Sequence, residues 1–280
     1  MNTLLKISTT LIFTLLFISS CGKTSTNPQE NVEENNEWEL IWSDEFDSDE
    51  LDQEKWSYQF GTGEEQGLTG WGNNELQYYT DHQENVFLED GQLHIVAFQE
   101  DYEEMEYTSA RIRTIDKGDW QHGKIEVRAK LPQGQGIWPA IWMLPTEEVY
   151  GGWPKSGEID IMEAVGHEPE IIHGTVHYGT DWPDNEYTGT PFSLENGIFA
   201  DNFHTFSIEW EEDQIIWFVD GNEFYSVTPD DLEPHPYPFN EEFHLILNLA
   251  VGGNWPGNPD ETTEFPQSIV VDYVRVYQID

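Results

Sequence analysis

The feature that most constrains this chain is a succession of short strand-like runs with almost no long helical periodicity. Each run is rich in β-branched or aromatic residues, and Gly, Pro, Asn and Asp separate one run from the next. Asp220-Gly221 is a strong signal for a hairpin turn. Such a pattern predicts an all-β sandwich of two curved antiparallel sheets, whose concave face suits an elongated ligand. The expected strands are 38–42, 76–80, 93–98, 110–115, 123–131, 137–144, 158–165, 172–177, 205–210, 215–219, 224–227, 243–249 and 269–277.

The charge of the chain limits its partners. With 55 acidic residues against 11 Lys and Arg, the formal net charge is −44, which argues against electrostatic binding to nucleic acid or to anionic membranes. We expect an acidic surface of this kind to suit a salty environment, where counterions screen the self-repulsion. No linker or internal repeat follows residue 36, so residues 37–280 are expected to form one domain, as a monomer.

The N-terminus is typical of an export signal. Lys6 precedes the apolar residues 11–18, and the small residues Ser19 and Ser20 stand before Cys21, the only cysteine. The sequence ISSC resembles a bacterial lipobox, which implies a signal peptide over residues 1–20 and a lipid on Cys21. The alternative is an ordinary signal peptide with an incidental cysteine. Residues 21–36 are polar and are expected to form a flexible tether. The prediction is a secreted lipoprotein at the outer membrane or surface of a bacterium.

A row of acids at residues 157–163 (GEIDIME) is the strongest candidate for chemistry. In a regular strand Glu158 and Asp160 would share one face, while Glu163 would be buried beside Ile159 and Ile161 at a large desolvation cost. A β-bulge near Ile161 would add one residue and return Glu163 to the face of the other two acids. The two Glu carboxyl groups could then approach to about 5 Å, the separation found in retaining glycosidases.

Three neighbouring carboxylates repel one another, so at least one of them should have a raised pKa and stay protonated near neutrality. An acid beside an anionic nucleophile is what glycoside hydrolysis requires. The alternatives are surface charge or a cation site, because acids at this spacing arise readily in so acidic a chain. The apolar residues between the acids favour the catalytic interpretation.

Tryptophans accompany the acid row. Trp138 and Trp142 lie four residues apart in an expected strand and therefore share a face, and Trp153 and Trp255 lie in Gly-rich segments. Indole rings stack on the apolar faces of sugars, so Trp138 and Trp142 are interpreted as ligand contacts. Trp210 and Trp217 belong to a tight hairpin and are instead expected in the core.

These residues and others along the chain resemble glycoside hydrolase family 16 in its laminarinase-like branch. The resemblance implies a β-jelly-roll (concanavalin A-like) that hydrolyses β-glucan internally with retention and needs no cofactor for catalysis. It implies Glu158 as nucleophile, Glu163 as general acid/base and Asp160 as the residue that tunes their protonation. The matching segments are 42–46 (WSDEF), 71–79 (WGNNELQYY), 136–144 (GIWPAIWML), 157–163, 173–178 (HGTVHY), 247–255 (LNLAVGGNW) and 271–277 (VDYVRVY).

The resemblance also implies a substrate and binding residues. The extra Met162 points to β-1,3-glucan such as laminarin, with mixed-linkage β-1,3-1,4-glucan as a possible second substrate. The positions matching sugar contacts are Asn73, Arg111, Trp138, Trp142, His177 and Trp255. A structural Ca²⁺ is implied at Glu45, the backbone carbonyl of Gly91 and Asp272. Two other functions stay open from the sequence, namely a galactan hydrolase of the agarase or carrageenase type and a surface glycan-binding protein without catalysis.

Overall fold

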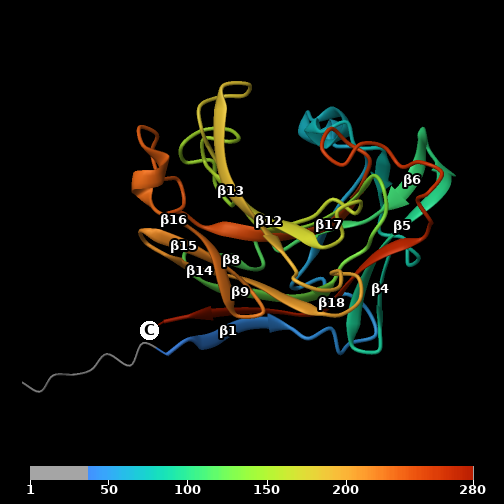
Figure 1. The fold of residues 1–280 in the computed structure, drawn as a ribbon, viewed down its shortest axis with the longest axis horizontal. Helices are drawn as coiled ribbons and strands as arrows, with labels where there is room; N and C mark the ends of the chain where they lie inside the picture. Colours follow the sequence, from blue (N-terminus) through green and yellow to red (C-terminus); the bar gives the residue numbers. More distant parts are fainter. Residues whose placement is uncertain (1–36, 280) are drawn as a thin grey trace, which may run out of the picture. The chain divides into compact units, whose positions relative to one another are not determined.

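The computed structural model describes residues 37–279, which fold into strands joined by turns and three short 3₁₀ helices (Figure 1). The predicted all-β fold is confirmed. The 3₁₀ helices are η1 (Glu64–Gln66), η2 (Thr69–Gly72) and η3 (Pro229–Leu232). The strands are β1 (Glu39–Asp44), β2 (Ser57–Gln59), β3 (Gln77–Tyr79), β4 (Val86–Glu89), β5 (Gln92–Tyr102), β6 (Met105–Ser109), β7 (Arg111–Arg113), β8 (Asp119–Trp120), β9 (Gly123–Lys130), β10 (Ile137–Pro145), β11 (Glu158–Glu163), β12 (Ile171–Gly179), β13 (Asn185–Ser193), β14 (His204–Glu211), β15 (Gln214–Val219), β16 (Asn222–Val227), β17 (Phe243–Val251) and β18 (Gln267–Gln278).

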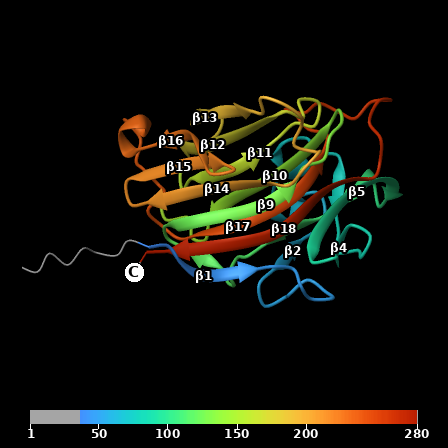
Figure 2. The same cartoon turned by 60° about the horizontal axis from the view of Figure 1, so that its bottom comes forward.

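The strands form two stacked sheets. One has the order β13-β12-β11-β10-β17-β7-β2, with β8 beside β17, and it contains the acid row in β11. The other has the order β16-β15-β14-β9-β18-β5-β6-β3, with β1 beside β18 and β4 beside β5, and its strands are seen side by side in Figure 2. The first sheet curves so that the β12–β13 hairpin rises at one end of its open face and the η1–η2 segment rises at the other (Figure 1). We refer to this open face as the concave face.

Alternation of side chains places the core between the sheets. Strands β9 and β12 alternate between buried and partly exposed residues along their whole length, which is the expected pattern for strands with one face in the core. Strand β17, in the middle of its sheet, is buried at every position. Trp210 and Trp217 are fully buried in this core, as the sequence predicts.

All thirteen expected strands are present with shifted ends, and the turn at Asp220-Gly221 joins β15 to β16 with both residues at positive φ (50° and 74°). Five strands were missed: β2, β4, β6, β8 and β13. Four of these are short, and β13 is a polar edge strand containing Gly189 and Pro191, so neither hydrophobicity nor alternation marks it. Within the described residues, no helix is long and apolar enough to cross a membrane.

Candidate active site

The predicted β-bulge is present in the acid row. Against β12, Asp160 pairs with Thr175 and Glu163 pairs with His173, so Ile161 and Met162 together lie opposite Gly174. Against β10 the register also shifts by one residue at the same place. The bulge turns Ile159, Ile161 and Met162 into the core, where each is at most 1% exposed, and leaves Glu163 on the concave face with Glu158. The bulge therefore resolves the burial conflict in the sequence.

The opposite sheet supports the bulge from behind. Trp217 of β15 donates its indole N–H to the backbone carbonyl of Asp160 across the core, at 2.9 Å. Gly174 leaves the space for this ring, because a Cβ at that position would lie 2.6 Å from Trp217 Cδ1. Strand β11 is thus held by its neighbours and by a hydrogen bond from the other sheet.

Glu158 is half-buried and has two neighbours that bear on its charge. Trp153 donates its indole N–H to Glu158 Oε2 at 2.7 Å, and His177 Nε2 lies 3.7 Å from Glu158 Oε1. The same His177 nitrogen lies 3.3 Å from Asp160 Oδ2, and Asp160 is only 1% exposed. A histidine between two carboxylates is stabilised in its protonated form.

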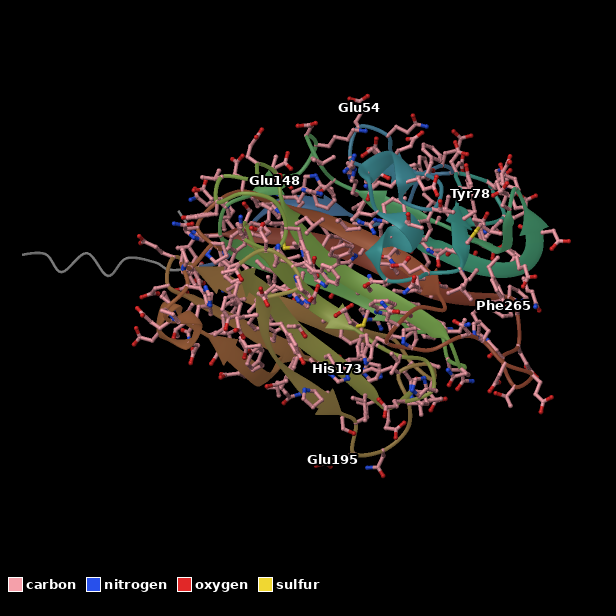
Figure 3. All side chains as sticks on the ribbon, turned by 90° about the horizontal axis from the view of Figure 1, so that it is seen from above. Glu54, Tyr78, Glu148, His173, Glu195 and Phe265 are labelled. Carbon is pink, nitrogen blue, oxygen red and sulfur yellow. The ribbon has the colours of Figure 1, made fainter. Side chains whose placement is uncertain are left out.

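Glu163 has a separate set of contacts at the other end of the row. Trp138 of β10 donates its indole N–H to Glu163 Oε1 at 3.0 Å. The Trp138 ring meets the edge of Trp255, with centroids 5.6 Å apart, and Trp255 also contacts the ring of His173 at 5.1 Å. Figure 3 labels His173 on the face viewed from above. Trp138 therefore contacts Glu163 directly, and Trp255 packs against Trp138 while it remains 41% exposed and accessible to a ligand.

The pKa values of these groups are displaced in a way that separates two roles. Burial, followed by the charge of Asp160, raises the pKa of Glu158 to about 7. Burial and the charges of Asp160 and Glu158 raise the pKa of Glu163 well above its ordinary value. Burial lowers the pKa of His177, but its hydrogen bond to Asp160 and the three nearby carboxylates outweigh this effect and raise that pKa to about 10. The raised pKa of Glu163 favours its protonated form, while near neutral pH a substantial fraction of Glu158 is ionised and His177 is a cation.

Beyond β10, a second group of predicted residues forms a stack. The guanidinium of Arg111 lies over Trp71 at 4.4 Å and over Trp142 at 4.7 Å, and its Nε donates to Gln59 Oε1 at 2.6 Å. Trp142 donates its indole N–H to Asn248 Oδ1 at 2.7 Å. Arg111 is only 7% exposed, so its main role in this arrangement is to hold the aromatic rings in place.

A buried hydrogen-bond chain continues from Asn248. Asn248 donates to the hydroxyl of Tyr79, and Tyr79 donates to Glu75 Oε2. Gln77 and Asn73 also donate to the Glu75 carboxylate, at 2.7 and 3.4 Å. Burial raises the pKa of Glu75, and the charge of Arg111 opposes this effect. Asn73 is thereby attached to the same network, and its backbone carbonyl accepts from the amide of Asn254, next to Trp255.

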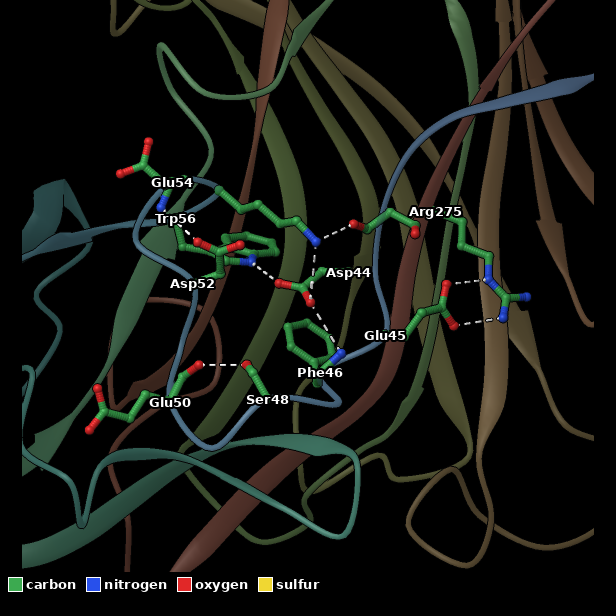
Figure 4. Close-up of polar contacts among 11 residues, drawn as sticks. Asp44, Glu45, Phe46, Ser48, Glu50, Asp52, Glu54, Trp56 and Arg275 are labelled. Carbon is green, nitrogen blue, oxygen red and sulfur yellow. Dashed lines mark hydrogen bonds and ion pairs between the residues drawn. The ribbon is translucent and has the colours of Figure 1, made fainter.

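Two groups of residues carry atoms of the kind that bind metal ions. Glu158, Asp160 and His177 each offer an atom within 4.8 Å of the others, so they are capable of holding a cation, although the same atoms account for the pKa displacements above. At the predicted calcium site, both carboxylate oxygens of Glu45 accept hydrogen bonds from Arg275, at 2.9 and 2.8 Å (Figure 4), and Asp272 pairs with Arg128.

Both predicted carboxylate ligands are paired with arginines in this structure, Glu45 with Arg275 and Asp272 with Arg128. A calcium ion bound through Glu45 and Asp272 would have to displace both arginines.

Comparison with known proteins gives this site a family. The model of the family described as glycosyl hydrolases family 16 matches residues 70–275, which include the bulged strand and both aromatic groups. The chain belongs to this family. Members of family 16 that degrade glucans need no cofactor for catalysis, and their jelly-roll fold is the sandwich described above.

Individual glucanases and laminarinases are similar to this family 16 protein over most of its length. The chain is 47% identical over 253 residues to the beta-glucanase of Rhodothermus marinus, covering 86% of this chain and 85% of that protein. It is 44% identical over 257 residues to glucan endo-1,3-beta-glucosidase A1 of Niallia circulans, which covers 85% of this chain but 38% of that protein. The crystal structure of the laminarinase catalytic domain from Thermotoga maritima is 47% identical, with a TM-score of 0.81, and covers 86% of this chain and 98% of that one.

Three residues of the site were missed from the sequence. Trp153 was noted in a Gly-rich segment but was not assigned to Glu158, although its position five residues before the acid row was a usable signal. Asn248 and Glu75 reach the site only through side-chain contacts between strands that are distant in sequence, so no local pattern announces them.

Proposed function

We propose that this protein is a retaining endo-glycoside hydrolase that cleaves β-1,3-glucan, with mixed-linkage β-1,3-1,4-glucan as a second substrate. The observation that carries the proposal is the pair of glutamates that one bulged strand presents on the concave face, each bound by an indole N–H and each with a raised pKa. The family match and the names of the relatives support the substrate class.

The protonated Glu163 donates its proton to the glycosidic oxygen while ionised Glu158 attacks the anomeric carbon. A covalent glycosyl-enzyme forms through an oxocarbenium-like transition state, and Glu163, now a base, removes a proton from the water that hydrolyses it. The indole N–H groups of Trp153 and Trp138 fix the two carboxylates. His177 and Asp160 have opposite effects on the pKa values of the two glutamates. The His177 cation lowers both values and so favours ionisation, whereas the Asp160 anion raises both values.

The deciding experiment compares product release from laminarin, lichenan and agarose, with the anomeric configuration of the first product followed by NMR. We expect the highest rate on laminarin, a lower rate on lichenan, none on agarose, and a β product first. Rapid release from agarose would support the galactan hydrolase instead, and absence of reducing sugar from all three would support a glycan-binding protein. An α product would contradict the nucleophile assignment.

We propose that the enzyme is held at the bacterial surface by a lipid on Cys21. Residues 1–36 lie outside the described residues, so this proposal depends on the sequence of the export signal alone. In cell fractionation of a bacterial host, the full chain should sediment with membranes and Cys21→Ala should become soluble. Equal distribution of the two proteins would contradict the lipid anchor.

Structural calcium stays a prediction that the arginine pairs oppose. If Glu45 and Asp272 release their arginines to bind Ca²⁺, CaCl₂ but not MgCl₂ should raise the melting temperature of the full chain, and Asp272→Asn should abolish that rise. An unchanged melting temperature after EDTA treatment would rule out a calcium contribution to stability.

A further inference from the structure

Two of the most exposed aromatic side chains of the described residues lie on one hairpin. Tyr187 of β13 is 69% exposed, and Trp182, in the turn between β12 and β13, is 72% exposed. Large aromatic rings in water gain nothing for folding, and exposed tyrosine and tryptophan are typical of surfaces that bind ligands. Neither residue belongs to the catalytic row or to the binding residues named above.

The register of the sheet connects Tyr187 to the catalytic row. Glu158 of β11 lies opposite His177 of β12, and His177 lies opposite Tyr187 of β13. Directly paired residues of antiparallel strands project from the same face of a sheet, so all three side chains belong to the concave face. Because neighbouring strands are about 4.8 Å apart, Tyr187 lies about 10 Å from Glu158 across the strands.

Aromatic contacts fill this interval. The rings of Trp153 and His177 have centroids 6.0 Å apart, and those of His177 and Tyr187 are 5.7 Å apart. Trp153 itself donates to Glu158. A continuous series of rings therefore leads from the nucleophile to the edge strand β13.

The turn that carries Trp182 is fixed at the same end of the concave face. Asp181 pairs with Lys155 at 2.8 Å, and Lys155 belongs to the loop that contains Trp153. Within the turn, the hydroxyl of Thr180 donates to the carbonyl of Asp184, and the amide of Asp184 donates to the carbonyl of Asp181. These contacts fix the backbone of the turn that carries Trp182, at the tip of the β12–β13 hairpin that rises in Figure 1.

We propose that Tyr187 and Trp182 form a distal sugar-binding subsite for a neutral glucan chain. This subsite rests on the proposed function, because its ligand is another part of the polysaccharide that is cleaved at Glu158. The two rings bind the apolar faces of pyranose units that extend past β12, and the polysaccharide gains affinity from units that are not cleaved. Asp181 and Asp184 stand within two residues of Trp182 in the turn, so a neutral chain is favoured over a sulfated or uronic-acid chain.

The test compares substrates of different length. We expect Tyr187→Ala and Trp182→Ala each to lower kcat/KM on laminariheptaose about five- to tenfold relative to laminaritriose, mainly through KM. Tyr187→Phe and Trp182→Phe should keep the wild-type ratio, because the ring and not its polar group binds the sugar. Ile41→Ala, which removes an exposed apolar side chain on β1 of the other sheet, is the matched control and should leave the ratio unchanged.

Other outcomes would overturn the subsite. Equal losses on the two oligosaccharides would indicate a structural role, and unchanged ratios would show that the rings contact no sugar. If the wild-type protein is a dimer by light scattering and the alanine variants are monomers with unchanged ratios, a second copy of the chain covers the rings instead.

Failure of the proposed function can be recognised separately. If the wild-type enzyme releases no sugar from laminarin, retardation in native gels containing laminarin measures binding alone. Loss of that retardation in the alanine variants, with retention in the phenylalanine variants, would then support the subsite without the hydrolase. Retention in all variants would overturn it.

Discussion

At the scale of single residues, the roles of Glu158 and Glu163 can be distinguished by the products that their alanine variants form in the presence of azide. We expect Glu158→Ala and Glu163→Ala each to lower kcat on laminarin by about 10²-fold to 10⁴-fold or more. Sodium azide should restore turnover of laminarin by Glu158→Ala and give an α-glycosyl azide, because azide takes the position of the nucleophile while Glu163 still protonates the leaving oxygen. Glu163→Ala lacks that acid, so its rescue is measured on an aryl β-laminaribioside whose phenolate leaves without protonation. Glu158 then forms the covalent intermediate, and azide should give the β-azide.

The configuration of each azide product is read by NMR. Glu148→Gln, an exposed glutamate, is the control and should keep normal turnover without azide. The two assignments would be exchanged if the α product came from the residue 163 variant, and both would be lost if either variant kept near-normal turnover.

His177 should set the pH range of the enzyme. The active form has Glu158 ionised and Glu163 protonated, so kcat/KM rises as pH passes the pKa of Glu158 and falls as pH passes the pKa of Glu163. The His177 cation lowers both pKa values. His177→Gln removes this charge, so both pKa values rise and both limbs of the profile move to higher pH.

The control for this shift is His173→Gln on the same strand. Burial lowers the pKa of His173, so it carries no charge near neutrality, and its removal should leave the two limbs in place. A profile of His177→Gln that moves to lower pH, or does not move, would show that His177 does not act through charge.

The acidic residues of the site could be predicted from the sequence. The groups that hold their carboxylates in place could not. The burial cost of Glu163 required a bulge near Ile161, and the bulge is found there. Trp153 is close to Glu158 in the sequence, but alternation specifies the face of a side chain and not its hydrogen bonds, so only the structure assigns the indole partners of Glu158 and Glu163. Trp142 illustrates this point, since its N–H is bound to Asn248 and only its ring remains for a ligand.

At the scale of secondary-structure elements, the bulge needs support from the opposite sheet. Trp217→Phe removes the donor to the carbonyl of Asp160 and leaves a buried acceptor without its partner, which costs about 1–3 kcal/mol of folding free energy. Because this carbonyl belongs to the catalytic strand, we also expect kcat to fall. Chemical denaturation and laminarin turnover measure the two effects.

Trp210→Phe is the matched control for Trp217→Phe. Trp210 is equally buried but donates to the carbonyl of Phe239 instead of to a carbonyl of β11, so its replacement should cost similar stability with a smaller change in kcat. Gly174→Ala should behave like Trp217→Phe, because the added Cβ displaces the Trp217 ring. Equal kcat in the two tryptophan variants would show that the bond to Asp160 does not position the catalytic strand.

Whether a strand could be predicted from the sequence depends on how its side chains are buried. Strands with one face in the core, such as β9 and β12, show the alternation that sequence patterns detect. Strand β13 lies at an edge with no strongly apolar face, and it was missed. Strand β13 carries Tyr187. The strand that sequence patterns failed to predict is therefore also the one on which we propose the distal subsite.

At the scale of the whole molecule, the excess of acids should make stability depend on salt. The sequence has 55 acidic residues and 11 Lys and Arg, and within the described residues the ion pairs of lysine and arginine involve Lys55, Lys124, Arg128, Lys155 and Arg275. Most carboxylates of the described residues therefore have no lysine or arginine partner, and they repel one another through the solvent. Their repulsion extends over about 30 Å at 0.01 M salt and about 10 Å at 0.1 M.

Raising NaCl from 0.01 M to 0.5 M should therefore raise the melting temperature by several degrees, with most of the rise below about 0.15 M. Salt also weakens the favourable ion pairs, but exposed pairs contribute only about 0–1 kcal/mol each and are greatly outnumbered. Sucrose, which favours compact states without screening, separates the two causes, because it should raise stability steadily and leave the NaCl effect intact. A melting temperature that falls with NaCl, or that does not change, would mean that the carboxylates are already neutralised by proton uptake or bound cations.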